Sequence, residues 1–394
     1  MIAADAPTRT IERAPLVRLD PVLLLLVASI LLLGLIMVTS ASVTAAAHES
    51  GDPFAYLERQ LVLVAGGVAL AALVFLVPIA AIERVALPLL IAAAVLLLLV
   101  LVPGLGHVVK GGRRWLRLPG INFQVSEAAR VLALVYIAHY CVRFETALRS
   151  SAGGLLRPVA LLASLGLLLL LEPDLGAATV LFATGFGLLF LAGAQLRWVL
   201  ASVLAASAAM SLLVMFSSYR MRRITGFLDP WADPYNTGFQ LTQSLIAIGR
   251  GEWFGVGLGA SVQKLFYLPE AHNDFLFAVL AEELGLAGVV LTIGLFLALA
   301  WRVFALARRA HDAGMKFHCY LAAGFALWLL VQAFVNIGVN MGVLPTKGLT
   351  LPLMSYGRSS MVVALAWLGL ILRVHHEVGG ARGGARGGAR ARPA

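Results

Sequence analysis

The sequence predicts an all-α membrane protein of about ten transmembrane helices, with a large extracytoplasmic loop between the seventh and the eighth. Hydrophobic residues make up 60% of the 394-residue chain, charged residues only 13%, and the mean hydropathy is +0.91. This composition excludes a water-soluble fold. Apolar runs such as 21–38 and 85–101 carry no charge and approach the length of a bilayer crossing. They must be helical, because hydrocarbon offers no partner to an open backbone group.

Apolar windows recur along the whole chain, and each is long enough to cross a membrane. The expected spans are residues 21–43, 60–82, 85–103, 127–144, 155–171, 177–194, 197–217, 275–300, 317–341 and 354–374.

Lysine and arginine predict the orientation. With both termini in the cytoplasm, most basic residues fall on the cytoplasmic side, and that side carries the whole net charge of +10. This is the asymmetry that membrane proteins show.

The chain divides into three parts. Residues 1–19 form a cytoplasmic arm, 20–376 a transmembrane domain that includes the large loop 218–274, and 377–394 a cytoplasmic tail. The tail repeats Gly-Gly-Ala-Arg, which cannot bury apolar area, so it is expected to be disordered. Its arginines suit anionic lipid rather than nucleic acid.

Basic residues on the expected outer side gather in two loops, 104–130 and 218–264. Such clusters oppose the topology rule. They indicate either an anionic ligand such as a phosphate, or contact with lipid headgroups and pairing with nearby acidic residues. The sequence leaves both interpretations open.

The end of the large loop carries acidic residues that could act in proton transfer. Pro269 suits the first turn of a helix, which would place Glu270 and Asp274 four residues apart on one face near the membrane surface. Paired carboxylates of this kind are typical of acid or base catalysis. The alternative is that Asp274 only caps a helix.

Two further pairs of acidic residues lie in or between the predicted spans. Glu282 and Glu283 lie roughly 12 Å deeper than Asp274, where ionisable groups pair or line a polar cavity. Glu172 and Asp174 lie in a short turn between the fifth and sixth spans, which ordinary proline and glycine punctuation also explains.

Other familiar sites are missing from the sequence. The glycines of 249–259 lack the Lys-Ser/Thr ending of a P-loop, the eight histidines show no zinc spacing, and the two cysteines fall in apolar stretches. His272 and Asp274 leave a Ser-His-Asp hydrolase open, although no Gly-x-Ser-x-Gly elbow is present.

Several long motifs resemble one known family. They are SVQKLFYLPEAHNDFLFAVLAEELG from Ser261, VNIGVNMGVLPTKGLTLPLMSYGRSSM from Val335, EPDLG from Glu172, and the runs that begin at Arg113 and Tyr219. Together they resemble the SEDS family (shape, elongation, division and sporulation), which contains FtsW and RodA. The run LPTKGLTLP from Leu344 is similar to the FtsW branch, which points to cell division.

The resemblance implies a peptidoglycan glycosyltransferase that polymerises lipid II. Asp274 matches the catalytic carboxylate of the family and would act as general base, with undecaprenyl pyrophosphate as the leaving group and inversion at the sugar. The resemblance leaves Mg²⁺ or Mn²⁺ open as a cofactor, with no ligand set named. The matching substrate-binding positions are Glu127, Arg130, Asp174, Lys264, Glu270, His272, Lys347, Ser355 and Ser360.

The same resemblance implies partners and a location. The partners are lipid II, a class B penicillin-binding protein (a transpeptidase), and other membrane proteins of the division complex, without nucleic acid. The location is the bacterial inner membrane at the division septum, with the active site on the periplasmic side. Two other hypotheses remain: a transporter that flips lipid II, and a scaffold without activity.

Overall fold

The computed structural model describes residues 17–109, 112–118, 121–216, 218–346 and 348–390. The helices in chain order are α1 (Pro21–Ser50), α2 (Ala55–Leu76), α3 (Ile79–Arg84), α4 (Ala86–Leu101), α5 (Val125–Arg143), α6 (Glu145–Ser150), α7 (Ala152–Leu171), α8 (Leu175–Leu191), α9 (Leu196–Met215), α10 (Ser218–Leu228), α11 (Phe239–Gly251), α12 (Leu276–Asp312), α13 (Lys316–Asn340) and α14 (Arg358–Arg390). The strands of the same residues are β1 (Gly106–Val109), β2 (Gly112–Leu118) and β3 (Ile121–Gln124).

Every predicted span coincides with a helix, which confirms the all-α membrane fold. Eight helices of the described chain are long and apolar enough to cross a bilayer, and α4 and α8 are shorter apolar helices of 16 and 17 residues. Two helices extend well past the predicted boundaries. The helix α1 continues to Ser50, and α12 continues to Asp312.

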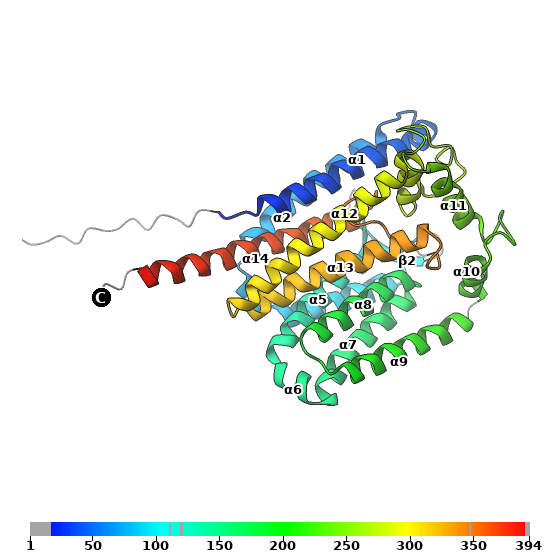
Figure 1. Cartoon of the computed structure of the whole chain (residues 1–394). Helices are drawn as coiled ribbons and strands as arrows, with labels where there is room; N and C mark the ends of the chain where they lie inside the picture. The colour runs from blue at the N-terminus through cyan, green and yellow to red at the C-terminus, as the bar shows by residue number, and fades with distance from the viewer. Residues whose placement is uncertain (1–16, 110–111, 119–120, 217, 347, 391–394) are drawn as a thin grey trace, which may run out of the picture.

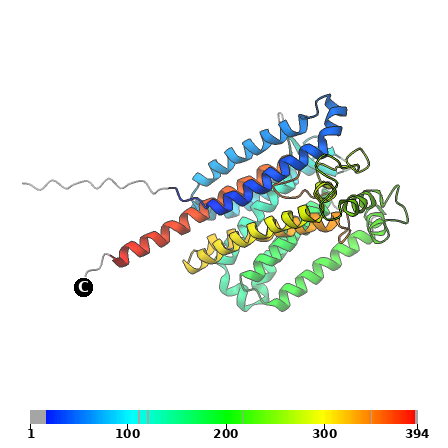
Figure 2. The ribbon, with the colours of Figure 1, turned by 45° about the horizontal axis from the view of Figure 1, so that its top comes forward.

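Figure 1 shows the long helices side by side, running between two ends of the bundle. We call the end that carries α10, α11 and β2 the loop end, and the end at which both described chain ends lie the terminal end. The helix α13 lies in the middle, with 72% of its apolar window buried, whereas the value for α9 is 6%. In both views α9 lies at the edge of the bundle across from α1 (Figures 1 and 2).

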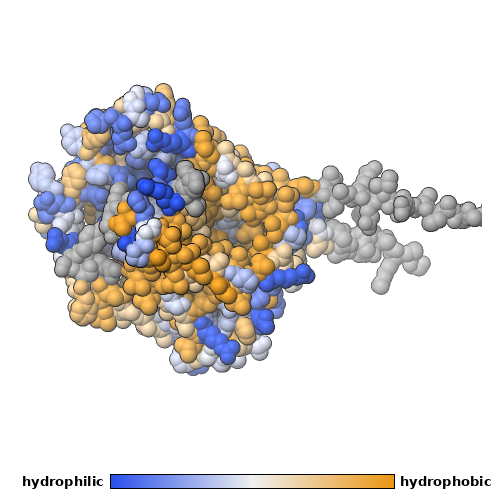
Figure 3. Space-filling view, turned by 180° about the vertical axis from the view of Figure 1, so that it is seen from behind, coloured by the Kyte–Doolittle hydropathy of each residue, from blue (hydrophilic) through white to orange (hydrophobic). Residues whose placement is uncertain are grey.

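The outer surface of the helices is apolar. Figure 3 shows hydrophobic residues over the middle of one face and hydrophilic residues gathered at the loop end. Leu25, Leu32, Leu204 and Leu291 are more than half exposed, although leucine is normally a core residue. Exposed apolar area of this extent fits a surface covered by lipid.

The helix α12 is broken at Gly285, and a segment of the large loop fills the break. Gly285 has φ 63° and ψ −161°, which only glycine adopts readily. The N–H groups of Val256 and Gly257 donate to the carbonyls of Glu282 and Glu283, at 2.9 and 3.1 Å. Leu286 donates to the carbonyl of Glu252 in return, at 2.9 Å. The freed backbone groups are therefore satisfied inside the protein, as membrane depth requires.

The two basic loops contain more regular structure than the sequence analysis assigned to them. The segment after α4 is an antiparallel sheet of order β1-β2-β3, in which Trp115 lies opposite Gln124. The segment 218–274 contains α10 and α11. The helix α11 forms because apolar residues such as Leu241 and Ala247 repeat at helical spacing and are buried.

At the terminal end, α1 is tied to α12. Asp20 caps α1 by accepting hydrogen bonds from the N–H groups of Val22 and Leu23, and Arg302 donates to both of its oxygens at 2.8 and 3.0 Å. The helix α14 continues to Arg390, into the segment for which disorder was predicted. The glycines of this segment disfavour a helix, but its alanines and arginines favour one, and extending an existing helix requires no new nucleus.

Candidate active site

A cavity of about 1350 Å³ at the loop end collects side chains from distant parts of the chain. Its lining comes from the ends of α1 and α2, from β2 and β3, from α8 to α11, and from the segments before α12 and α14. The charged, tyrosine and histidine side chains of the lining are Glu49, Tyr56, Arg114, Asp174, Arg223, Glu270, His272, Asp274, Tyr356 and Arg358.

The cavity has a long apolar arm between α8 and α9. Along α8 its lining runs from Leu175 to Phe190, which is roughly 22 Å at 1.5 Å per residue. Along α9 it runs from Val199 to Met215. The aromatic rings of α8 and the small and flexible side chains of α9 make this arm suitable for an apolar chain.

The segment that carries Asp274 is a turn, so the predicted helix beginning at Pro269 is wrong. Glu270 has φ 58°, in the left-handed region, which interrupts a helix. The N–H groups of Asn273 and Phe275 both donate to the carbonyl of Glu270, at 3.0 and 3.3 Å. Glu270 and Asp274 therefore line the cavity from one turn rather than from one helical face.

The backbone of Asp274 is anchored to α13. The side-chain amides of Asn336 and Asn340 donate to its carbonyl oxygen at 2.9 and 3.1 Å. Both asparagines are buried, and Asn336 also donates to the carbonyl of Leu349 at 2.6 Å. The carboxylate of Asp274 is thus held at the cavity by a rigid element, which a catalytic group requires.

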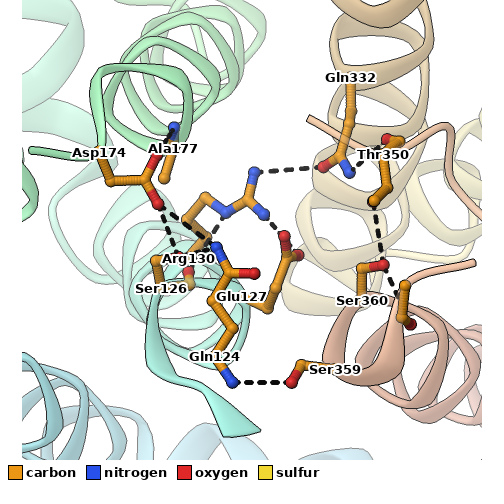
Figure 4. A network of polar contacts seen from close by, with 11 residues as sticks. Gln124, Ser126, Glu127, Arg130, Asp174, Ala177, Gln332, Thr350, Ser359 and Ser360 are labelled. Atoms are coloured by element: carbon orange, nitrogen blue, oxygen red, sulfur yellow. Dashed lines mark hydrogen bonds and ion pairs between the residues drawn. The ribbon is translucent and has the colours of Figure 1, made fainter. Parts of the chain in front are cut away.

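Asp174 lies at the start of α8, where it caps the helix. One of its oxygens accepts from the N–H of Ala177 at 3.0 Å, and the other accepts from the Ser126 hydroxyl at 3.1 Å and the Gln124 side chain at 3.4 Å (Figure 4). Asp174 and Gln124 both line the cavity. These contacts join α8 to the start of α5.

Glu127 and Arg130 form a buried ion pair one turn apart on α5. Arg130 also donates to the carbonyl of Ser126 at 3.2 Å and to the side chain of Gln332 on α13 at 3.2 Å (Figure 4). Arg130 is 1% exposed and Glu127 5% exposed, and neither lines the cavity. The pair lies behind the cavity wall.

Lys264 lies in a second buried ionic cluster. Its amine is 2.9 Å from Glu283 and 3.0 Å from the Ser40 hydroxyl of α1. Beside it, Glu282 accepts from Ser261 at 2.6 Å and pairs with Arg250 at 3.2 Å. Of the two alternatives that the sequence leaves open for Glu282 and Glu283, the structure shows pairing inside the bundle. Lys264 itself is buried in this cluster and does not line the cavity.

The segment before α14 supplies the remaining predicted positions. Ser360 lines the cavity and its hydroxyl accepts from Thr350 at 3.0 Å, whereas Ser355 is buried and accepts from the N–H of Leu351 at 3.0 Å. Lys347 lies outside the described residues.

Glu172 is a buried acid in the turn before Asp174. It is fully buried, and neither of its side-chain oxygens has a hydrogen-bond partner among the described residues. Burial first and the nearby charge of Asp174 second raise the pKa of its carboxyl to about 8, against the opposing charge of Arg114. The carboxyl of Glu172 is therefore largely protonated at neutral pH.

The family of cell cycle proteins that includes FtsW, RodA and SpoVE matches residues 21–379. The chain belongs to this family. The match covers the whole helical bundle, the cavity and every predicted site residue.

Named relatives of this family are similar over nearly their whole length. A probable peptidoglycan glycosyltransferase FtsW of Thioalkalivibrio sulfidiphilus is 56% identical over 360 residues, which are 91% of this chain and 90% of the relative. The protein of the same name from Halorhodospira halophila is 49% identical over 383 residues, 96% of this chain and 97% of the relative.

Solved structures of the family share the fold. A chain of a peptidoglycan synthase complex, described as coordinating polymerization and crosslinking, has a TM-score of 0.75 and 34% identity, covering 91% of this chain and 98% of that chain. The rod shape determining protein RodA of Thermus thermophilus has a TM-score of 0.69 and 32% identity, covering 92% and 99%.

The described residues contain no group of three or more histidine, cysteine, aspartate or glutamate side chains placed to hold a metal ion. The described residues therefore offer no ligand set for a divalent cation.

Five of the ten site residues expected from the sequence line the cavity, and several other lining residues were not identified from the sequence. Asp174, Glu270, His272, Asp274 and Ser360 line the cavity together. The additional lining includes Glu49, Tyr56, Arg114, Tyr356 and Arg358. Arg114 belongs to the cluster of basic residues in the loop 104–130, for which an anionic ligand was one of two interpretations. Tyr356 and Arg358 lie within a motif that resembles the family. No sequence motif marked Glu49 or Tyr56, which lie at the end of α1 and the start of α2.

Proposed function

We propose that this chain is a peptidoglycan glycosyltransferase, as its relatives are named, and that it polymerises lipid II with Asp274 as general base. The observation that carries the proposal is the shape of the cavity. One arm is a long apolar slot between two helices, and the other end carries Asp274 and cationic side chains. A substrate with a polyprenyl chain, a pyrophosphate and sugars has these three parts in the same order.

The residues of the cavity suit each part of the reaction. The carboxylate of Asp274 takes the proton of the acceptor 4-hydroxyl, whose oxygen forms a bond to the anomeric carbon of the donor sugar. The bond from that carbon to the pyrophosphate oxygen breaks, and undecaprenyl pyrophosphate leaves. Attack from the opposite side inverts the linkage from α to β.

Cationic side chains at the mouth of the slot suit the leaving group. Arg114, Arg223 and Arg358 line the cavity and come from three separate segments. Arg223 donates to the carbonyl of Thr346 at 3.2 Å, which ties α10 to the segment before α14. Fixed positive charge of this kind stabilises the negative charge that develops on a departing pyrophosphate.

The buried pairs behind the wall support the site without touching substrate. The Glu127–Arg130 pair joins α5 to α13, and the Lys264–Glu283 pair joins the large loop to α12. We assign them positioning roles, in place of the substrate contacts that the family resemblance implies.

The location and partners belong to the same proposal. The loop end faces the periplasm, both termini face the cytoplasm, and the protein works in the inner membrane at the division septum. It acts with a class B penicillin-binding protein and other membrane proteins of the division complex. The charge asymmetry supports this orientation, and the similarity to a chain of a synthase complex supports the partnership.

Substitution of Asp274 tests the proposal. Purified Asp274→Asn and Asp274→Ala proteins, assayed with lipid II and the transpeptidase partner, should fold normally and make no glycan polymer. The matched control is Asp233→Asn, because Asp233 is a partly exposed carboxylate of the same loop and does not line the cavity. Substantial polymer from an Asp274 variant would contradict the assignment. Transport of lipid II that persists in Asp274→Ala, without polymer from the wild type, would identify a flippase instead.

A further inference from the structure

Three aromatic rings meet at the side of the cavity next to α2. The ring centroids of Tyr56 and His272 are 4.6 Å apart, those of Tyr56 and Tyr356 5.0 Å, and those of His272 and Tyr356 5.7 Å. All three residues line the cavity. We call them the ring cluster.

The ring cluster is held in place by hydrogen bonds from separate elements. The N–H of Tyr356 donates to the carbonyl of His272 at 3.1 Å, and the Tyr56 hydroxyl donates to Glu49 at 2.8 Å. The side chain of Gln60, one turn after Tyr56 on α2, donates to the carbonyl of Ser355 at 3.4 Å. These contacts join α1, α2 and the segments before α12 and α14, so the rings are already arranged when a ligand arrives.

The hydroxyl of Tyr356 is buried and has no hydrogen-bond partner among the residues that the structure describes. The residue as a whole is 6% exposed. A buried hydroxyl without a partner destabilises a fold, so such groups usually serve a ligand. Other atoms of Tyr356 line the cavity, so a small rotation of the ring would bring the buried hydroxyl to a ligand there.

The ring cluster and the apolar slot belong to different elements of the cavity wall. The slot runs between α8 and α9, and α9 lies at the edge of the bundle across from α1 and α2 (Figure 1). His272 is two residues before Asp274 and contacts both tyrosines. An inverting displacement needs the attacking oxygen and the leaving group on opposite sides of the anomeric carbon. With the leaving pyrophosphate at the slot, the attacking sugar falls on the side of the ring cluster.

We infer that the ring cluster binds the acceptor sugar, an inference that rests on the proposed function. A pyranose presents an apolar face of C–H groups and an edge of hydroxyls, and a pocket with aromatic rings and a few polar groups matches both. The Tyr356 hydroxyl and the Glu49 carboxylate provide the polar groups, and the rings of Tyr56 and His272 provide the apolar surface. The acceptor 4-hydroxyl then lies beside Asp274.

A probe that can only be an acceptor tests this inference. The methyl glycoside of the N-acetylglucosaminyl–N-acetylmuramic acid disaccharide carries no pyrophosphate, so it cannot be a donor, and it carries no lipid, so it does not use the slot. With lipid II as donor, transfer to this probe forms one glycosidic bond, releases undecaprenyl pyrophosphate and yields a soluble product that can be counted.

Tyr356→Phe removes one oxygen and keeps the ring. We expect the KM for the methyl glycoside to rise about five- to tenfold, the loss of one hydrogen bond, with a smaller change in kcat. The melting temperature should stay the same or rise, because an unsatisfied buried hydroxyl is removed. The matched control is Tyr140→Phe, since the Tyr140 hydroxyl donates to the carbonyl of Gly154 at 2.7 Å, away from the cavity. That variant should lower the melting temperature and leave the KM unchanged.

The outcomes separate this inference from the proposed function. An unchanged KM for the methyl glycoside in both Tyr356→Phe and Tyr56→Leu, with Asp274→Asn inactive, overturns the ring cluster as the acceptor site and leaves the base in place. An active Asp274→Asn with a raised KM in Tyr356→Phe overturns the base and keeps the acceptor site. A wild-type protein that makes no product from the probe also overturns the inference.

Discussion

The backbone of Gly348 lies against the carboxylate of Asp274, so that a Cβ atom built on Gly348 would be 3.2 Å from Oδ2. That distance is shorter than ordinary van der Waals contact, and the carboxylate must move to admit a methyl group. Gly348→Ala should therefore shift the proposed base by a few tenths of an ångström. We expect kcat to fall about 10- to 100-fold with little change in melting temperature.

Gly249→Ala is the control for this variant. Gly249 lies in α11, and a Cβ atom there would meet nothing within 4 Å. Its kcat should match that of the wild type. A Gly348→Ala protein with normal kcat would mean that the position of the Asp274 carboxylate has no effect on the reaction.

The buried pair of Lys264 and Glu283 predicts strong coupling in a double-mutant cycle. The two groups are 2.9 Å apart and at most 4% exposed. Lys264→Met or Glu283→Gln leaves one buried charge without its partner, which should destabilise the protein by about 3–5 kcal/mol. The double variant Lys264→Met/Glu283→Gln should lose clearly less than the sum of the two, measured by denaturant unfolding. Additive losses would show that the pair does not interact.

The break in α12 makes Gly285 a position that admits no side chain. Its backbone angles belong to a region nearly exclusive to glycine, and a Cβ atom would lie 2.3 Å from the backbone nitrogen of Gly255. Gly285→Ala should destabilise the protein by about 3 kcal/mol or more. Gly294→Ala on the same helix is the control, since nothing lies within 4 Å of a Cβ there. It should be neutral or stabilising in the same thermal unfolding measurement.

The sequence predicts the spans well because an apolar run without charges satisfies its backbone hydrogen bonds in hydrocarbon only as a helix. It predicts the boundaries less well, since α12 continues past Trp301 into the basic stretch that ends at Asp312. A helix that is already nucleated can extend through polar residues at a low cost in free energy. The break at Gly285 was invisible, because the loop segment that satisfies its backbone lies some thirty residues earlier in the chain.

The candidate site was predicted where the chain carries local motifs and missed where it depends on packing. Asp274 and His272 lie in one recognisable run, and both line the cavity. Tyr56 reaches the same cavity only because α2 packs against α14 and the segment before it, where Gln60 contacts Ser355. The resemblance implies that Lys264 contacts substrate, and no sequence pattern indicated that its amine pairs with the buried carboxylate of Glu283 on α12. Tertiary pairing of this kind leaves no local pattern.

Glu172 predicts an unusual dependence of stability on pH. Burial first, and the charge of Asp174 second, raise the pKa of this carboxyl from about 4.5 to about 8. The folded state therefore binds the proton more tightly than the unfolded state does. The stabilisation is complete below about pH 4.5 and is lost as the pH rises to about 8. Glu172→Gln, which cannot ionise, should lose less stability than the wild type over this range.

The measurement is the melting temperature of both proteins between pH 5 and pH 8. The difference between Glu172→Gln and the wild type should grow in favour of the variant as the pH rises, because only the wild type must keep a buried acid protonated. Asp233→Asn is the control: hydrogen bonds from Thr237 and Asn236 lower the pKa of this partly exposed carboxyl, so it stays ionised throughout the range. A constant difference between Glu172→Gln and the wild type would show that Glu172 is already ionised in the folded protein, and its unpartnered oxygens would then need a cation or water beside them.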